Sequence, residues 1–244
     1  MVSASALITG GTGGFGVAVA RRLLATGFAV VLADIDIARG PGVAAALGAT
    51  FVHCDVASRG SLNAAVAVAE QHGPLRTVHL NAGIGSRVTG FDSISDDIYR
   101  RVMAVNVDGV WFGIKAALPA LRRAGGGHVV VTASLAGLEP WEAEPAYSTA
   151  KHAAVALVRS VAPALAAEDI VVNVICPGFA DTPLLPQQIR DAGLPLLSTD
   201  EVADAAMEAS TVGRPGQVYL VLPGHDVIDY QHRGSPKPDG TPAN

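Results

Sequence analysis

The stretch that decides the fold lies near the start of the chain and reads Thr9-Gly10-Gly11-Thr12-Gly13-Gly14-Phe15-Gly16. An apolar run at residues 4–9 leads into it, and a helix-like stretch at residues 15–26 follows. Glycine suits this place because the turn is tight, the backbone must approach a phosphate without obstructing Cβ atoms, and the helix must pack closely on the sheet. The free N–H groups at a helix start attract anions. The stretch therefore predicts a strand, a phosphate-binding turn and a helix.

The rest of the chain continues the same alternation. We expect seven strands, at residues 4–9, 28–33, 50–56, 75–80, 128–133, 170–176 and 217–222. We expect helices at residues 15–26, 41–47, 61–72, 94–124, 146–167 and 198–210, with the fourth interrupted around residues 106–109. Strands that are apolar throughout need cover on both faces. The pattern predicts an α/β fold, a Rossmann-like doubly wound parallel sheet of about seven strands with helices on both faces, in three αβα layers.

Length and composition fit one domain of this kind. The 244 residues carry 17 Lys and Arg against 22 Asp and Glu, a net charge of −5, and half of them are apolar. Such a chain buries enough surface to fold without disulfides or a metal. We expect a single dinucleotide-binding catalytic domain at residues 1–233 and a flexible tail at residues 234–244.

Several classes of partner are disfavoured. The acidic balance argues against nucleic-acid binding, which usually needs a basic face. No apolar run is long enough for a membrane span, and the N-terminus lacks the features of a secretory signal, so we expect a cytoplasmic protein. Cys54 and Cys176 lie in apolar runs far apart in the sequence, and we expect buried free thiols. No Cys and His cluster is present, so we expect no metal site.

An acidic residue follows the second predicted strand. Asp34 lies eighteen residues after Gly16, near the spacing of about twenty at which an acid accepts from a ribose 2′-OH and repels a 2′-phosphate. Ile35 follows it, and position 13 in the turn is Gly rather than a base. Arg39 is close enough in sequence to swing towards a phosphate. We therefore predict NAD as the cofactor in preference to NADP.

Tyr147 and Lys151 lie four residues apart in a helix-like stretch. Residues at this spacing share one face of a helix. A phenol has an ordinary pKa of about 10, and a nearby ammonium group stabilises the phenolate. The pair is therefore a candidate acid/base unit.

At these residues the chain resembles the short-chain dehydrogenase/reductase family, over about residues 4–225. Thr9-Gly10-x3-Gly14-x-Gly16 matches the family's cofactor loop, Asp55-Val56 its adenine contact, and Asn81-Ala82-Gly83 its fourth-strand motif. Ser134 precedes Tyr147 by the usual thirteen residues. Asn106 lies where the family keeps a catalytic Asn, and Pro177-Gly178 with Thr182 matches the nicotinamide-binding segment. Leu80 departs from the pattern, because the family often has Asn there.

The resemblance implies an NAD-dependent dehydrogenase or reductase of a secondary alcohol or ketone. Tyr147 would be the acid/base, and Lys151 would bind the nicotinamide ribose and lower the Tyr147 pKa. Ser134 would hold the substrate oxygen, and Asn106 would fix a water for proton relay. The implied cofactor contacts are Gly10, Thr12, Gly13, Gly14, Phe15, Gly16, Asp34, Ile35, Asp55, Val56, Asn81, Ala82, Gly83, Tyr147, Lys151, Pro177, Gly178, Phe179 and Thr182. The family also implies a homotetramer or homodimer, paired through the helices around residues 102–121 and 150–166.

The substrate is less defined by the sequence. We expect substrate contacts from Ser134, Trp141, Glu144, Tyr147 and Leu184, with Glu142 or Glu144 facing a polar substrate group. Two other functions are compatible with the fold. A non-catalytic redox sensor that binds a dinucleotide would usually lose the Tyr–Lys pair, which this chain keeps. Epimerase relatives are longer, and the dehalogenating lyases lack the Gly-rich loop and the Lys.

Overall fold

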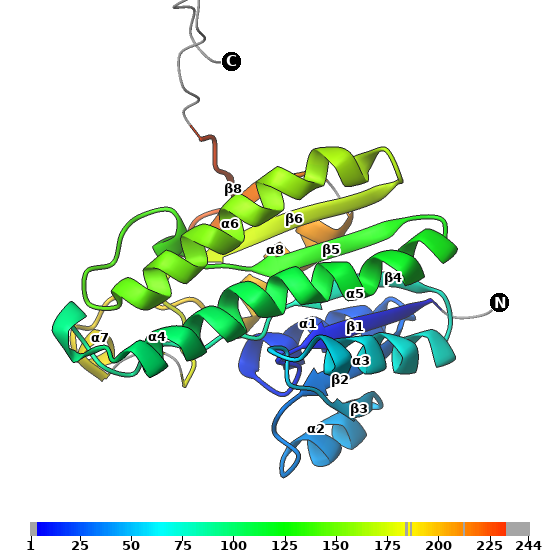
Figure 1. The fold of residues 1–244 in the computed structure, drawn as a ribbon, viewed down its shortest axis with the longest axis horizontal. Helices are drawn as coiled ribbons and strands as arrows, with labels where there is room; N and C mark the ends of the chain where they lie inside the picture. Colours follow the sequence, from blue (N-terminus) through cyan, green and yellow to red (C-terminus); the bar gives the residue numbers. More distant parts are fainter. Residues whose placement is uncertain (1–3, 184, 186, 212, 233–244) are drawn as a thin grey trace, which may run out of the picture.

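The seven predicted strands form one parallel sheet. The structure, a computed structural model, describes residues 4–183, 185, 187–211 and 213–232. The strands lie in the order β3-β2-β1-β4-β5-β6-β7-β8 (Figure 1). Their bounds are β1 (Ser5–Thr9), β2 (Ala29–Asp34), β3 (Thr50–His53), β4 (Leu75–Leu80), β5 (Gly127–Thr132), β6 (Ile170–Pro177) and β7 (Val218–Val221). An eighth strand that the sequence did not predict, β8 (Ile228–Asp229), pairs antiparallel with β7 at the edge.

Helices cover both faces of the sheet, as predicted. One face carries α1 (Gly14–Ala25), α2 (Gly40–Leu47) and α8 (Thr199–Thr211), and the other carries α3 (Arg59–Gln71), α5 (Gly109–Arg123) and α6 (Pro145–Ala166). Each face has its own apolar core, and inner strand residues such as Leu7 and Ile8 are 1% and 0% exposed. The strands are mainly apolar because each of their faces is buried under a helix layer, although β4 also carries Arg76, Thr77 and His79.

The helix expected over residues 94–124 is one continuous rod with a widened turn. It consists of α4 (Asp96–Met103), a π-helical segment η2 (Ala104–Asp108) and α5. The predicted interruption is in the right place, but the chain does not break there. Single π turns inside α-helices are frequent at functional sites, and this one contains Asn106.

The carboxyl ends of the parallel strands meet at one edge of the sheet. The strand order reverses between β1 and β4, and ligands of open α/β sheets bind outside the strand ends at such a switch point. The glycine-rich turn, Asp34, Asn81, Ser134 and Pro177 all lie at or just after the ends of their strands. The fold therefore brings residues from distant parts of the sequence to one edge.

Smaller elements complete the described chain. Short 3₁₀ turns, η1 and η3, lie at Phe91–Ser93 and Leu135–Gly137, and a short helix, α7, at Gln187–Asp191. The expected tail at residues 234–244 lies outside the described residues. Within those residues, none of the helices combines the length and apolar character that a membrane span requires. Cys54 and Cys176 are buried and unpaired, as predicted.

Candidate active site

The glycine-rich turn is built for close backbone contacts. Gly10 has a φ of +61°, and a Cβ there would lie 2.9 Å from the Ala82 Cα. A Cβ on Gly16 would lie 2.5 Å from the Gly10 carbonyl oxygen. Helix α1 starts from Gly13 with no side-chain cap, so its first N–H groups have no side-chain partner there. This uncapped, glycine-lined helix start fits the pyrophosphate of a dinucleotide.

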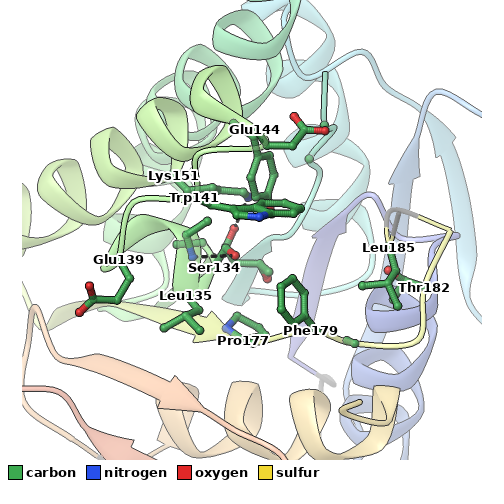
Figure 2. Close-up of a pocket in the computed structure, with 18 of the residues that line it drawn as sticks. Ser134, Leu135, Glu139, Trp141, Glu144, Lys151, Pro177, Phe179, Thr182 and Leu185 are labelled. Atoms are coloured by element: carbon green, nitrogen blue, oxygen red, sulfur yellow. Dashed lines mark hydrogen bonds between the residues drawn. The ribbon is translucent and has the colours of Figure 1, made fainter. Parts of the chain in front are cut away.

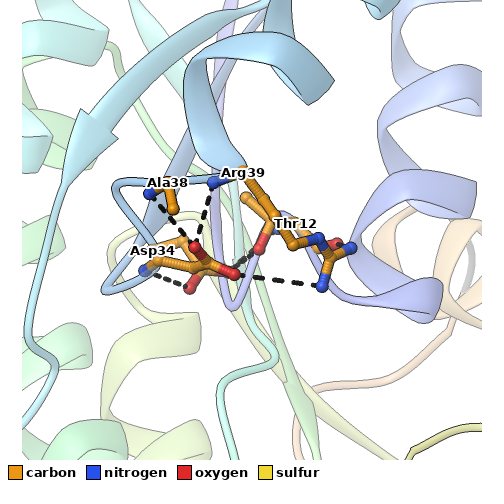
Figure 3. Close-up of polar contacts among 5 residues, drawn as sticks. Thr12, Asp34, Ala38 and Arg39 are labelled. Atoms are coloured by element: carbon orange, nitrogen blue, oxygen red, sulfur yellow. Dashed lines mark hydrogen bonds and ion pairs between the residues drawn. The ribbon is translucent and has the colours of Figure 1, made fainter.

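Asp34 lies beside this turn at the end of β2. Its Oδ2 accepts from the Thr12 N–H at 3.0 Å and from the Thr12 hydroxyl at 2.7 Å, while its Oδ1 accepts from the Asp36 N–H at 3.1 Å (Figure 3). A carboxylate offers about four acceptor positions, so capacity for a ribose hydroxyl is left. Ile35 is 63% exposed next to it.

Arg39 reaches back to the same turn. Its Nη2 donates to the Thr12 carbonyl at 3.2 Å, and its Nη1 lies 3.9 Å from the Asp36 carboxylate. Figure 3 shows this side chain next to Thr12 and Asp34. The sequence left open whether Arg39 comes close, and the structure places it there.

The segment after β3 has two different roles. The Asp55 Oδ1 accepts from the Ala57 N–H at 2.9 Å, which closes a turn. The Val56 side chain is 7% exposed and faces Gly109, where a Cβ would come within 3.0 Å of it. Its side chain therefore belongs to the core, and its predicted contact with the cofactor stays a prediction.

Asn81 ties the end of β4 to the glycine turn. Its side chain donates to the Gly10 carbonyl at 3.1 Å. The N–H groups of Asn81 and Ala82 both donate to the Thr9 hydroxyl, at 3.0 and 3.2 Å. These hydrogen bonds hold the two segments that the sequence predicts to bind the cofactor against each other.

Lys151 and Tyr147 lie one turn apart on α6. The Lys151 Nζ donates to the Thr132 carbonyl at 2.9 Å and lies 5.4 Å from the centroid of the Tyr147 ring. Ser134 follows β5, and its Oγ accepts from the Ala136 N–H at 3.1 Å. All three side chains line one cavity.

Burial is the largest influence on these ionisable groups. It raises the pKa of Tyr147 to about 12, which the hydrogen bond with Ser134 opposes and the charge of Glu144 increases. It lowers the pKa of Lys151 to about 8. Desolvation disfavours the charged forms of both groups, and the lowering of the Tyr147 pKa by Lys151 stays a prediction.

Asn106 organises the loop after β4. It is fully buried, and its amide donates to the Ile84 and Val102 carbonyls at 2.8 and 3.0 Å, while its Oδ1 accepts from the Ile84 N–H at 3.1 Å. A Cβ on Gly83 would lie 2.8 Å from that Oδ1 and 3.2 Å from the Lys151 Nζ. The side chain thus holds the loop directly against Lys151, and its water-relay role stays a prediction.

The cavity has a volume of about 250 Å³ (Figure 2). The rings of Trp141 and Phe179 meet edge-on across it, with centroids 5.7 Å apart. Its other lining residues are Phe15, Asn81, Gly83, Gly85, Thr132, Ala133, Ser134, Leu135, Ala136, Glu139, Pro140, Glu144, Tyr147, Lys151, Pro177, Gly178, Ala180, Thr182 and Leu185. The described residues hold no group of three or more acidic, His or Cys side chains placed to bind a metal.

Glu144 and Glu142 differ sharply in position. Glu144 is 6% exposed and lines the cavity, and its Oε2 accepts from both the N–H and the hydroxyl of Ser86. Glu142 is exposed and does not line it. Of the two carboxylates that the sequence offered, Glu144 therefore lines the cavity and Glu142 does not. Leu184, also expected there, lies outside the described residues.

Comparison with known proteins decides the family. The family model described as short chain dehydrogenase matches residues 4–192. The chain is a short-chain dehydrogenase/reductase.

Its relatives and structural neighbours agree with this assignment. It is 36% identical over 225 residues to the 2-(R)-hydroxypropyl-CoM dehydrogenase of Xanthobacter autotrophicus, covering 86% of this chain and 90% of the relative. It is 35% identical over 188 residues to the cyclohexanol dehydrogenase of an Acinetobacter species, covering 75% of each. A solved 3-ketoacyl-(acyl-carrier-protein) reductase of Brucella melitensis, complexed with NADH, superposes with a TM-score of 0.81 at 28% identity and covers 91% of this chain and 97% of its own.

The short-chain dehydrogenase/reductase fold gathers most of the predicted residues. Phe15, Asn81, Gly83, Ser134, Trp141, Glu144, Tyr147, Lys151, Pro177, Gly178, Phe179 and Thr182 line the cavity. The other predicted cofactor residues lie along the same edge of the sheet or just after it, while Asn106 acts from behind the loop. Thr132 and Ser86 were not predicted, because their contributions depend on contacts with residues far along the chain.

Proposed function

We propose that this short-chain dehydrogenase/reductase is an NAD-dependent oxidoreductase that transfers a hydride between nicotinamide and a secondary alcohol or ketone. The observation that supports this most is the meeting of Ser134, Tyr147 and Lys151 on a cavity whose other walls are Phe15 and the segment from Pro177 to Thr182. The same cavity joins the predicted acid/base to the predicted nicotinamide segment. The named activities of the hydroxypropyl-CoM and cyclohexanol dehydrogenases support a secondary alcohol as substrate.

Each of the four catalytic residues has a task in this proposal. The Tyr147 phenolate takes the proton from the alcohol oxygen in oxidation, and the Tyr147 phenol gives a proton to that oxygen in reduction. The Ser134 hydroxyl holds that oxygen against Tyr147. The Lys151 Nζ, fixed by the Thr132 carbonyl, has donors left for the ribose hydroxyls. Asn106 keeps the loop at Gly83 in place and would hold a relay water.

The cofactor would be held by the glycine turn, Asp34 and the segment after β6. When bound, nicotinamide would accept or donate the hydride, and its oxidised form would carry a positive charge. Asp34 favours NAD because its carboxylate accepts from ribose hydroxyls and repels a 2′-phosphate. Thr12 already orients that carboxylate through two hydrogen bonds.

Two measurements test the proposal. Thermal unfolding with NADH and with NADPH at equal concentration compares the cofactors, since a ligand at a hundred times its Kd stabilises the folded state by about 2.7 kcal/mol. We expect a clear stabilisation with NADH and a small one with NADPH. Purified protein with NAD and a panel of secondary alcohols should then produce NADH. The absence of any cofactor stabilisation would overturn the assignment.

We also propose that the protein forms a homotetramer or homodimer through α5 and α6. Trp111 on α5 is 50% exposed and Tyr99 on α4 is 43% exposed. Large aromatic side chains are enriched at subunit contacts. Size-exclusion chromatography with light scattering should give a mass of two or four chains, and Trp111→Glu should lower it. A monomeric wild-type protein would refute this part.

A further inference from the structure

Glu144 is a buried carboxylate beside the catalytic tyrosine. It directly precedes α6, three residues before Tyr147, and is 6% exposed. Figure 2 shows it above the cavity, between α6 and the loop after β4. A Cβ on Gly85 would lie 3.3 Å from its Oε1. The glycine therefore leaves room around this oxygen.

The two oxygens of Glu144 are used unequally. Oε2 accepts both hydrogen bonds from Ser86. Within the part of the chain that the structure describes, Oε1 accepts no hydrogen bond, and no cationic side chain lies within ion-pair distance of the carboxylate. A buried charge without a partner is costly once solvent is removed. A ligand that fills the cavity must therefore either bring a donor to Oε1 or leave that charge unpaired.

The other charged side chains that line the cavity are Glu139 and Lys151. Glu139 is exposed and also lines it. Among the described residues Lys151 is the one Lys or Arg in the lining, and its Nζ is held by the Thr132 carbonyl. Figure 2 shows the Glu139 carboxylate directed away from the cavity, so Glu144 is the carboxylate that would repel an anionic substrate group there.

We propose that Glu144 sets substrate specificity by accepting a hydrogen bond on Oε1 from a second donor group of the substrate. The substrate class is then a secondary alcohol, or its ketone, that also carries a hydroxyl or a protonated amine and no acidic group. This inference rests on the proposed function, because Ser134 and Tyr147 hold the reacting oxygen while Glu144 takes the second group.

The test compares matched alcohols on the same enzyme. The probes are cyclohexanol, the cyclohexanediols, the aminocyclohexanols and a hydroxycyclohexanecarboxylate, each with NAD. The readout is the ratio of kcat/KM for each substituted alcohol to that for cyclohexanol. We expect at least one diol or amino alcohol to exceed cyclohexanol by about 10- to 100-fold, since a hydrogen bond to a charged group has this worth. The hydroxy acids should be poorer than cyclohexanol.

Three variants separate recognition from a structural role. Glu144→Gln replaces the carboxylate by an amide. It should lower the kcat/KM of the preferred diol or amino alcohol, relative to that of cyclohexanol, by about tenfold or more. Ser86→Ala removes one bond to Oε2 and leaves Oε1, so the ratio should stay high even if the overall rate falls. Glu142→Gln alters an exposed carboxylate two residues away and should change nothing. Equal loss for cyclohexanol and for its substituted forms in Glu144→Gln would mean that Glu144 only braces the loop, and would overturn the inference.

Failure of the proposed function gives a different result. In that case cyclohexanol, its substituted forms and their ketones would all fail to react with NAD or NADH. Calorimetric binding of the same probes in the presence of NADH then decides the role of Glu144 without turnover. Tighter binding of the diol or amino alcohol by wild type, lost in Glu144→Gln, supports the inference. The inference is contradicted if wild type binds cyclohexanol and its substituted forms with equal affinity. It is also contradicted if Glu144→Gln still binds the diol or amino alcohol more tightly than cyclohexanol.

Discussion

Two carboxylates in this molecule are held by the same pair of hydrogen bonds but lie in different surroundings. Asp34 accepts on one oxygen from the N–H and hydroxyl of Thr12, and Glu144 accepts on one oxygen from the N–H and hydroxyl of Ser86. Asp34 is half-buried with Arg39 nearby, whereas Glu144 is 6% exposed and has no cation beside it among the described residues. The hydrogen bonds orient each carboxylate, whereas burial and neighbouring charge differ between the two, and on our proposal these differences set which group each would bind.

The largest expected effect belongs to Tyr147, which lines the same cavity as Glu144. Tyr147→Phe removes the acid/base and leaves Asp34 and its turn untouched. We expect kcat to fall by about 10²- to 10⁴-fold, the usual worth of a general acid/base, while NADH binding stays at the wild-type level. Steady-state kinetics and fluorescence titration with NADH measure the two quantities. Full activity in the variant would remove Tyr147 from its role.

Asp34→Ala tests the other carboxylate. We expect the Kd for NADH to rise by about 10- to 100-fold, because charge-assisted hydrogen bonds to the ribose are lost. The ratio of kcat/KM between diols and cyclohexanol should stay unchanged, since Glu144 lies at the other end. Asp36→Asn is the matched control, as Asp36 accepts from the Ala38 and Arg39 N–H groups at 3.2 and 3.0 Å. Unchanged NADH affinity in Asp34→Ala would assign the ribose to other groups.

The charge of Glu144 also acts on Tyr147. Four groups face the phenol, namely Ser134, Glu144, Lys151 and Cys176. Burial raises the pKa of Cys176 to about 12, so that thiol is neutral at physiological pH, and Glu144 is the anion that raises the Tyr147 pKa. Removing this anion lowers the pKa, which leaves more phenolate at a given pH.

Glu144→Gln should therefore shift the pH dependence of alcohol oxidation to lower pH. Oxidation needs the deprotonated phenol, so its rising limb moves down with the pKa. Ketone reduction needs the protonated phenol and should lose its alkaline end sooner. Profiles of kcat/KM in both directions measure the shift, with Glu142→Gln as the reference. A limb that stays in place, or moves to higher pH, would show that Glu144 does not act on the phenol through its charge.

The positions of the two carboxylates could be predicted from the sequence to different degrees. Asp34 follows the glycine turn within one strand-helix-strand unit, so its place beside that turn could be predicted from local spacing. Glu144 is held by Ser86, fifty-eight residues away, and no local pattern connects them. Its proximity to Tyr147 made it a candidate, but only packing separates it from the exposed Glu142. The part that Thr132 plays could not be predicted for the same reason, because its carbonyl, at the end of β5, accepts a hydrogen bond from Lys151 on α6.

Some elements of the fold could likewise be predicted from the sequence, and others could not. The seven parallel strands could be predicted because runs buried on both faces are apolar throughout. The two-residue β8 is exposed and too short to carry a pattern. The interruption at Asn106 was visible as a weak helical stretch, yet the π turn that spans it depends on the bonds of Asn106 to Val102 and to Ile84 in another segment.

The smallest expected effect belongs to Arg39, the feature that most distinguishes the Asp34 site from the Glu144 site. Its guanidinium is largely exposed, with a side-chain exposure of 64%, and exposed ion pairs are worth about 0–1 kcal/mol. Arg39→Ala should therefore weaken NADPH binding by no more than about fivefold and leave the NADH affinity unchanged, because Asp34 still faces the ribose. Titration with both cofactors at low and moderate salt measures this, since screening weakens an exposed contact. A loss of NADH affinity comparable to that in Asp34→Ala would instead mean that Arg39 positions Asp34 through its bond to the Thr12 carbonyl. The nearby cation would then help to orient Asp34, as the hydrogen bonds already orient both carboxylates, and would not act on the cofactor by its charge.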